Sequence, residues 1–391
     1  MIRKSIAIFI LFSYLFGTQA FAVDENQILR QIEAGKNYLL RVMDPEWHAF
    51  HKRYDCLRDD SGSRLRTIYT ASSLYTLLKV YRLTHDEDIA RQIPGIAGFL
   101  LSMQNHEGEN RGAFHYSFDT KTLKKEPRFV TGTASKTIFT MLEMFRFTQD
   151  PVYLESAKEA GQWLLRMQNA DGSAAAQAVS RDEKWVNVQK FSFLYNGQVL
   201  SALSRLYRVT SDPTYYEAAS KIARLVIAKA EAQHYWVGDE YRRPNPVSTS
   251  WVIMSLLDFY KAGRDRASLE TILKSSNELL KHQHTDPEDP ANYGRYQGSE
   301  TTSGNGWICE VLGEAYNFSA EKYKNAILLG VRWLIRNTYT EENTRGFKNP
   351  AMPVGGLIRS PSEASVRTDA VCHGVNGYIG ILEKLTEESK A

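Results

Sequence analysis

The sequence of 391 residues predicts an all-helical fold in which about six helix pairs close into a ring. Three observations predict this fold. One helical pattern recurs along the chain, a second pattern alternates with it, and each end of the chain carries one helix that has no partner beside it in the sequence. Self-similarity at a period of roughly 50 residues is typical of repeated two-helix units.

The first pattern is an amphipathic helix that ends in an aromatic or apolar residue followed by two aliphatic residues. Its clearest copies are Phe99-Leu-Leu-Ser-Met-Gln and Trp163-Leu-Leu-Arg-Met-Gln, and successive copies lie roughly 53 to 64 residues apart. Each copy gathers its apolar residues on one face, as a surface helix does. We therefore predict six outer helices, at residues 28–42, 87–104, 151–168, 213–230, 267–283 and 320–337.

The second pattern is a helix that begins with small or capping residues and is apolar on more than one side. Such helices are expected in an inner layer, where neighbours cover them all round. We predict six inner helices, which begin near Thr70-Ala-Ser-Ser, Gly132-Thr-Ala-Ser, Asn196-Gly-Gln-Val, Ser248-Thr-Ser-Trp, Gly304-Asn-Gly-Trp and Asp369-Ala-Val-Cys.

The order of the helices predicts how the ring closes. The first outer helix and the last inner helix lack a partner, so their contact completes the sixth pair, whereas an open solenoid would need polar capping repeats. Turns from inner to outer helices are short, as at Thr148-Gln-Asp-Pro, but the return links run to roughly 16 to 30 residues. Because long loops carry function and helix N-termini favour anions, we place the active face at these loops.

The N-terminus predicts export. Residues 1–22 combine a basic start, an apolar run from Ser5 to Gly17 and an Ala-x-Ala site, which together indicate a signal peptide. The apolar run is too short for a typical membrane span, so we expect a periplasmic or secreted protein without a stable membrane anchor. No Pro-, Gly- or Ser-rich linker divides residues 23–391, which we predict to be one domain.

Charge and cysteine usage exclude several classes of function. Removing residues 1–22 takes away Arg3 and Lys4 and no acidic residue, so the net charge falls from +3 to about +1, and no basic stripe predicts nucleic-acid binding. No nucleotide-binding glycine motif and no zinc motif is present, so we expect no cofactor. A requirement for Ca²⁺, which no motif supports, stays open. A disulfide between Cys309 and Cys372 and buried free thiols both remain open, with Cys56 as the third cysteine.

The segment Trp163-Leu-Leu-Arg-Met-Gln-Asn-Ala-Asp-Gly172, with its echo at Phe99–Gly108, resembles the α/α-toroid proteins. This superfamily includes terpenoid cyclases, protein prenyltransferases, and the (α/α)6 glycoside hydrolases, polysaccharide lyases and uronyl epimerases. The chain lacks the Asp-x-Asp-Asp motif of squalene-type cyclases, and its Asp369, Cys372 and His373 match the prenyltransferase zinc ligands only superficially. The segment from Gly355 is similar to the terminal segments of carbohydrate-active toroids, so the resemblance implies a polysaccharide or oligosaccharide substrate.

The C-terminal segment holds the first candidate site. Helical spacing places Asp369, His373 and Asn376 on nearly one face, so that a carboxylate lies beside an imidazole and orients it for proton transfer. Arg359 and Arg367 are candidates for holding a substrate carboxylate. The alternative is that Asp369 caps the helix and His373 is a satisfied core residue.

Two long loops hold the second group of candidates. Tyr241 and Tyr296 are candidates for proton transfer at a sugar carbon, with Arg243 and Arg295 beside them for a uronate carboxylate. Hydrolysis would instead need two carboxylates, one on each side of the glycosidic bond. Glu300 is a candidate for one of them, and the sequence alone does not identify the second. Paired aspartates at Asp59-Asp60 resemble those of some (α/α)6 hydrolases and are equally consistent with a turn.

Aromatic and basic residues recur where the inner helices begin. Trp251 and Trp307 are candidates for stacking on sugar rings, although core packing is the commoner role of such residues. The arginines that precede the first two inner helices are candidates for substrate binding: Arg64, Arg66 and Arg128.

The sequence therefore predicts an exported enzyme that acts on an acidic polysaccharide by lyase or uronyl-epimerase chemistry, or by glycoside hydrolysis. A non-catalytic glycan-binding or assembly protein of an exopolysaccharide system is the alternative. The two differ in whether proton-transfer groups converge in the cleft, because a binder needs no acid/base pair.

Overall fold

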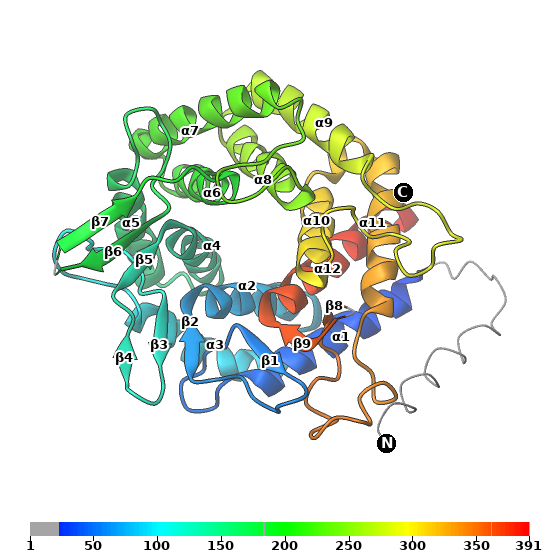
Figure 1. Cartoon of the computed structure of the whole chain (residues 1–391). Coiled ribbons are helices and arrows are strands. Elements are labelled where there is room, and N and C mark those ends of the chain that lie inside the picture. Colours follow the sequence, from blue (N-terminus) through cyan, green and yellow to red (C-terminus); the bar gives the residue numbers. More distant parts are fainter. Residues whose placement is uncertain (1–22, 183, 361, 391) are drawn as a thin grey trace, which may run out of the picture.

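Twelve α-helices form two concentric layers in the computed structural model, which describes residues 23–182, 184–360 and 362–390. The predicted leader, residues 1–22, lies outside the described residues. The outer helices are α1 (Glu25–Val42), α3 (Glu87–Ser102), α5 (Pro151–Arg166), α7 (Pro213–Ala232), α9 (Arg266–Leu280) and α11 (Ala320–Arg336). The inner helices are α2 (Thr67–Thr84), α4 (Thr131–Thr148), α6 (Phe193–Thr210), α8 (Pro246–Gly263), α10 (Thr302–Glu314) and α12 (Thr368–Lys390). The predicted alternation is confirmed, and Figure 1 shows the ring viewed along its axis.

Repeated local signals set the short turns. Four inner helices end at a residue with positive φ, and the next residue is an aspartate whose carboxylate accepts a backbone N–H of the following outer helix. Proline occupies the first turn of α5 and α7, where its missing N–H costs no helical hydrogen bond. The capping aspartates are Asp86, Asp150, Asp212 and Asp265.

The two ends of the helical chain meet. Helix α1 packs beside α12, and Gly35 allows this approach because a Cβ there would lie 2.5 Å from Val375 Cγ2. A second contact closes the ring at the loops, where β1 (Arg53–Asp55) pairs with β9 (Glu363–Arg367). The predicted pairing of first and last helices is thereby confirmed (Figure 1).

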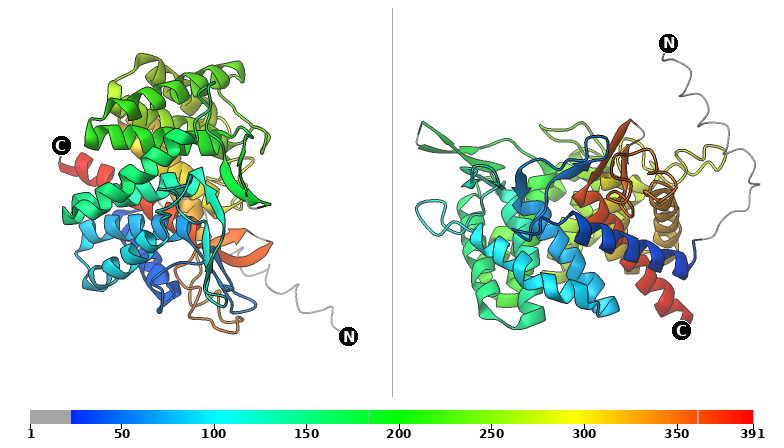
Figure 2. Two further views of the ribbon diagram at one scale, coloured as in Figure 1. Left: turned by 90° about the vertical axis from the view of Figure 1, so that its left-hand side faces the viewer. Right: turned by 90° about the horizontal axis from the view of Figure 1, so that it is seen from below.

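The long loops gather at one end of the ring, as Figure 2 shows. They form three small antiparallel sheets that the helical patterns did not predict. The first, β1-β9-β8, includes β8 (Ile358–Ser360); the second joins β2 (Arg64–Arg66), β3 (Ser117–Asp119) and β4 (Lys124–Lys125); the third joins β5 (Arg128–Val130), β6 (Gln177–Arg181) and β7 (Lys184–Val188). Each sheet includes strands from two different long loops, so neighbouring loops brace one another.

Ion pairs fill the opposite end, between the C-terminal halves of the inner helices. The thirteenth residues of these helices form what we call the base layer: Lys79, Glu143, Arg205, Asp258, Glu314 and Gly380. Arg205 Nε donates to Asp258 Oδ2 at 2.9 Å, and Glu314 accepts from Lys261 at 2.9 Å and lies 3.6 Å from Lys79 Nζ. Burial opposes the ionised form of Glu314, but the lysines prevail and lower its pKa to about 2.

All three cysteines are free and buried. Of the two states left open, the free thiols are therefore the ones observed, and the Cys372 thiol lies 3.6 Å from Ser73 Oγ. Among the described residues, no helix combines the length and the apolar character needed to cross a bilayer.

Candidate active site

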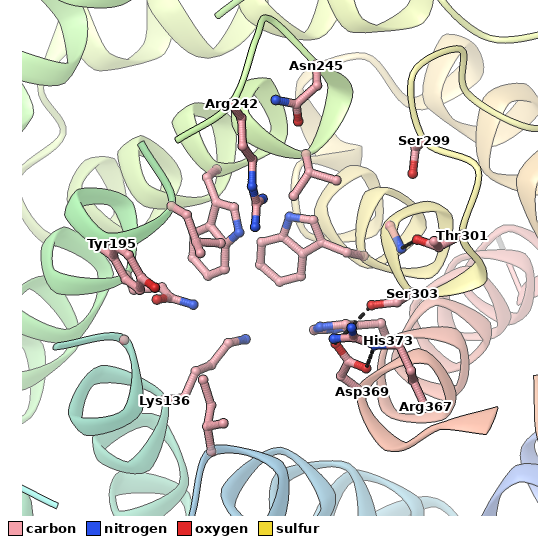
Figure 3. A pocket seen from close by; sticks show the side chains of 18 of the residues that line it. Lys136, Tyr195, Arg242, Asn245, Ser299, Thr301, Ser303, Arg367, Asp369 and His373 are labelled. Carbon is pink, nitrogen blue, oxygen red and sulfur yellow. Dashed lines mark hydrogen bonds and ion pairs between the residues drawn. The ribbon is translucent and has the colours of Figure 1, made fainter. Parts of the chain in front are cut away.

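A cavity of about 680 Å³ opens at the loop end of the ring, a volume in the range of small-molecule sites. Two layers of inner-helix residues build much of its wall. The second residues form the mouth layer: Ile68, Gly132, Leu194, Val247, Ser303 and Asp369. The sixth residues form the cavity layer: Ser72, Lys136, Gln198, Trp251, Trp307 and His373. The inner helices thus start in register, and one position on each of them faces the same space (Figure 3).

A hydrogen-bonded dyad lies at one side of this cavity. His373 Nδ1 is 2.6 Å from Glu310 Oε2, and Asn376 Nδ2 donates to Glu310 Oε1 at 3.1 Å. Burial opposes ionisation of Glu310, but His373 and then Lys136 outweigh it and lower the pKa of the carboxyl. An ionised carboxylate only accepts, so Nδ1 is the donor in this contact, and Nε2 is a proton acceptor in the neutral imidazole.

Asp369 has a different partner. Arg367 binds both of its oxygens, at 2.9 Å and 2.6 Å, and Ser303 Oγ donates to it at 3.0 Å. Burial would raise the pKa of Asp369, but the Arg367 guanidinium prevails and lowers it. A second Arg367 contact reaches the Tyr69 hydroxyl at 3.0 Å, so this arginine and aspartate brace each other at the mouth.

Three cations that line the cavity have no carboxylate within ion-pair distance among the described residues: Lys136, Arg242 and Arg243. Lys136 Nζ lies 4.8 Å from the centroid of the Trp307 ring and 5.3 Å from that of Trp251. Burial lowers the pKa of Lys136 below its ordinary value. Arg242 belongs to the loop before α8, and its side chain reaches into the cavity (Figure 3).

The two tryptophans stack on each other, with ring centroids 4.2 Å apart and an angle of 23° between planes. Each side chain is only 3% exposed, and Trp307 Nε1 has no hydrogen-bond partner among the described residues. One face of each indole is therefore occupied by the other, and both residues line the cavity.

Solved structures with the same architecture come from carbohydrate enzymes. Cellobiose 2-epimerase from Bacillus thermoamylovorans B4167 superposes with a TM-score of 0.74 at 14% identity, over 92% of this chain and 99% of that one. A D-mannose isomerase gives 0.72 at 13%, over 94% and 100%. The GH76 α-mannanase of Bacteroides thetaiotaomicron gives 0.68 at 12%, over 94% and 99%. The fold is an α/α toroid.

No protein-family model matches the chain, and no curated protein matches it in sequence. At such low identity the superpositions establish the fold alone.

The toroid brings part of the predicted site together. The predicted residues that line the cavity are Arg243, Trp251, Glu300, Trp307, Arg367, Asp369 and His373. Asn376 lies one layer deeper, bound to Glu310. The carboxylate hydrogen-bonded to His373 is Glu310 of the neighbouring helix, and not Asp369 of the same helix as the sequence predicted.

The remaining predicted residues lie away from the cavity lining. Tyr296 is fully buried in the core, and Tyr241 is 41% exposed at the rim, where it packs on Tyr195. Arg66 and Arg128 flank the ring of Tyr116, a residue of the cavity wall.

The other predicted arginines and aspartates also lie outside the lining. Arg64 lies 3.8 Å from Asp119, Arg359 pairs with Glu363, and Arg295 belongs to the loop that precedes α10. Asp59 accepts a hydrogen bond from Tyr54, and Asp60 pairs with Asp55 through the backbone, so these two aspartates form a turn.

Sequence reasoning missed Lys136, Glu310 and Arg242. Lys136 and Glu310 are single charges within apolar stretches of inner helices, at their sixth and ninth residues. Lys136, Trp251, Trp307 and His373 are each the sixth residue of an inner helix. Aligning the six inner helices at their first residues would therefore have found Lys136. Arg242 lies in a loop, where no periodic signal distinguishes inward from outward residues.

Proposed function

We propose that this protein is an exported carbohydrate-active enzyme that moves a proton at a sugar carbon, by epimerisation or β-elimination. The observation that carries the proposal is the His373–Glu310 dyad at the cavity wall. A carboxylate that accepts from Nδ1 holds the ring in one orientation and stabilises the imidazolium that forms when Nε2 takes a proton. A hydrogen-bonded imidazole and carboxylate at the cavity wall also favour an enzyme over a non-catalytic glycan binder, which needs no acid/base pair.

Glycoside hydrolysis has weaker support. It needs two carboxylates on either side of the bond, about 5 to 9.5 Å apart. Among the described residues that line the cavity, the carboxylates are Glu300 and Asp369, and Asp369 is already bound by Arg367 and Ser303. The acid/base work is therefore assigned to His373.

The substrate is proposed to be acidic. Lys136, Arg242 and Arg243 leave an excess of positive charge over the two carboxylates, and the N-terminal ends of six inner helices point to the same space. The volume of the cavity, about 680 Å³, suits a short saccharide or the end of a polysaccharide. Export rests on the leader-like residues 1–22.

The test incubates residues 23–391 in deuterium oxide with short uronate-containing and neutral saccharides. Deuterium at a carbon next to a carbonyl or carboxylate would support epimerisation or isomerisation. An unsaturated, ultraviolet-absorbing end would support elimination. New reducing ends without either signal would replace the proposal by hydrolysis, and binding without any chemical change would replace it by the glycan-binding alternative.

A further inference from the structure

Lys136 differs from the other cations that the inner helices place within the ring. Arg205 pairs with Asp258 and Lys79 with Glu314, whereas Lys136 has no carboxylate within ion-pair distance among the described residues. Its neighbours are the rings of Phe139, Trp251 and Trp307, all centred 4.8 to 5.3 Å from Nζ. The charge of Glu310 favours the ammonium of Lys136, but burial outweighs it, and a buried cation that forms no ion pair costs stability. This cost points to a role for Lys136 in the cavity.

The position of Lys136 complements that of His373. Both are sixth residues of inner helices, and Figure 3 shows the Lys136 nitrogen directed into the cavity, across from the His373 side chain. Both also lie next to Trp307: the imidazole centroid is 5.0 Å from the indole centroid, and Lys136 Nζ is 4.8 Å from it. A sugar at the edge of Trp307 would be within reach of both groups, one on each side.

The protonation chemistry of Lys136 suits a second role in proton transfer. Burial lowers its pKa, which makes the ammonium a better proton donor than an ordinary surface lysine. Its long side chain can approach the substrate, because no hydrogen bond or ion pair within the described residues holds Nζ to a wall.

We propose that Lys136 is a second proton-transfer residue, which acts on the face of the sugar carbon opposite to His373. This inference rests on the proposed function and deepens it. His373 Nε2 takes the proton as the C–H bond breaks, and the electron pair moves into an enolate on the neighbouring carbonyl or carboxylate. The Lys136 ammonium then supplies the proton of the new C–H bond on the other face. Proton exchange with water restores the imidazole and the ammonium, and the net change is inversion at that carbon.

The experiment uses Lys136→Arg and Lys136→Met, with a saccharide that the wild-type protein epimerises. Arginine keeps the charge but does not donate its proton at ordinary pH, and methionine keeps the length without the charge. We expect both variants to lose turnover by roughly 10²- to 10⁴-fold, the usual contribution of a positioned acid or base. Thermal unfolding of both variants, and Lys158→Arg at a surface ion pair as the matched control, would separate this loss from misfolding.

Deuterium exchange gives the deciding readout. In deuterium oxide, both Lys136 variants should still exchange the proton of the epimer that His373 deprotonates, while producing no second epimer. His373→Gln should show the reverse, with exchange only in the other epimer. The rate for the wild type should fall as pH rises through the lowered pKa of Lys136, because the ammonium is then lost.

Four outcomes would overturn the inference. Full turnover in either Lys136 variant removes the residue from proton transfer. A higher KM with unchanged kcat in Lys136→Met, restored in Lys136→Arg, assigns Lys136 to holding a substrate anion. If the wild type forms unsaturated ends without epimerising any saccharide, the proposed function stands as elimination and this inference fails. If it neither exchanges deuterium nor forms unsaturated ends, the proposed function itself fails, and that failure is recognised before any variant is made.

Discussion

The cavity layer and the base layer lie on the same six helices, seven residues apart. They differ in whether their charged side chains form ion pairs. In the base layer, Arg205 meets Asp258, Lys79 and Lys261 meet Glu314, and Glu143 accepts from Arg82. In the cavity layer, Lys136 forms no ion pair within the described residues, although the charge of Glu310 partly offsets the effect of burial on its pKa. The Oε1 of Gln198 and the Nε1 of Trp307 also lack hydrogen-bond partners there.

The difference separates stability from function on one scaffold. Buried polar groups in folded proteins are nearly always paired, and unpaired ones concentrate where a ligand supplies the partner. The base layer satisfies its charges internally and contributes to holding the helices together. The cavity layer leaves donors open, which costs stability and is useful only if a substrate binds.

The largest effect is expected from His373→Gln in the cavity layer. Glutamine can still donate to Glu310, but it cannot take a proton, so kcat should fall by roughly 10²- to 10⁴-fold while the unfolding temperature changes little. Steady-state kinetics and calorimetry measure the two quantities. His106→Gln, at an exposed position paired with Glu159, is the matched control. Retained activity in His373→Gln would remove the dyad from the mechanism.

In the base layer, Asp258→Asn should have the opposite profile. It leaves the Arg205 guanidinium, whose side chain is only 18% exposed, without its anionic partner. We expect a loss of about 3 kcal/mol in the free energy of unfolding, measured by urea denaturation, with kcat and KM nearly unchanged. Glu155→Gln, at an exposed ion pair with Lys158, should cost less than about 0.5 kcal/mol. A large loss of kcat in folded Asp258→Asn would show that the two layers are coupled.

Arg242→Gln tests the open cations of the cavity. Loss of one charge-assisted hydrogen bond of about 1.5 kcal/mol should raise KM for an acidic saccharide roughly tenfold and leave kcat nearly constant. A neutral saccharide of the same size should be unaffected. The control is Arg266→Gln, because Arg266 is 90% exposed on α9. Equal effects on acidic and neutral saccharides would contradict an electrostatic role for Arg242.

The smallest effect is expected from Tyr296→Phe. The sequence named Tyr296 as catalytic, but its side chain is fully buried and its hydroxyl has no partner among the described residues. Removing that hydroxyl should leave kcat and KM within about twofold and keep or slightly raise stability. Kinetics and thermal unfolding measure both. A clear loss of turnover in a folded variant would return Tyr296 to the site.

The helices were predictable because their signals are local. The 3.6-residue period separates outer from inner helices, and the aspartate caps and prolines mark where outer helices begin. Ring closure followed from the order of the elements alone. The loop sheets were not predictable, because their strands are short and pair between loops that are distant in the sequence, as Arg64 with Asp119.

The site was predictable only where it lies on helices. His373, Trp251 and Trp307 were found because they follow the start of an inner helix by the same number of residues. Tyr296 and Tyr241 were misplaced because a loop gives no period that separates core, cavity and surface. Glu310 was missed because its contact with His373 joins α10 to α12, and the sequence offered a nearer carboxylate, Asp369, four residues before the histidine.

The pairing of α1 with α12 has a consequence for when the protein becomes active. His373, Asp369 and Arg367 all belong to the segment that closes the ring. Glu310, the partner of His373, lies on α10, which is synthesised earlier. A growing chain can fold its first five helix pairs in order of synthesis, but it has no acid/base dyad until the final helix arrives. Under the proposed function, a polypeptide that stalls before α12 would therefore have most of the ring but no acid/base dyad.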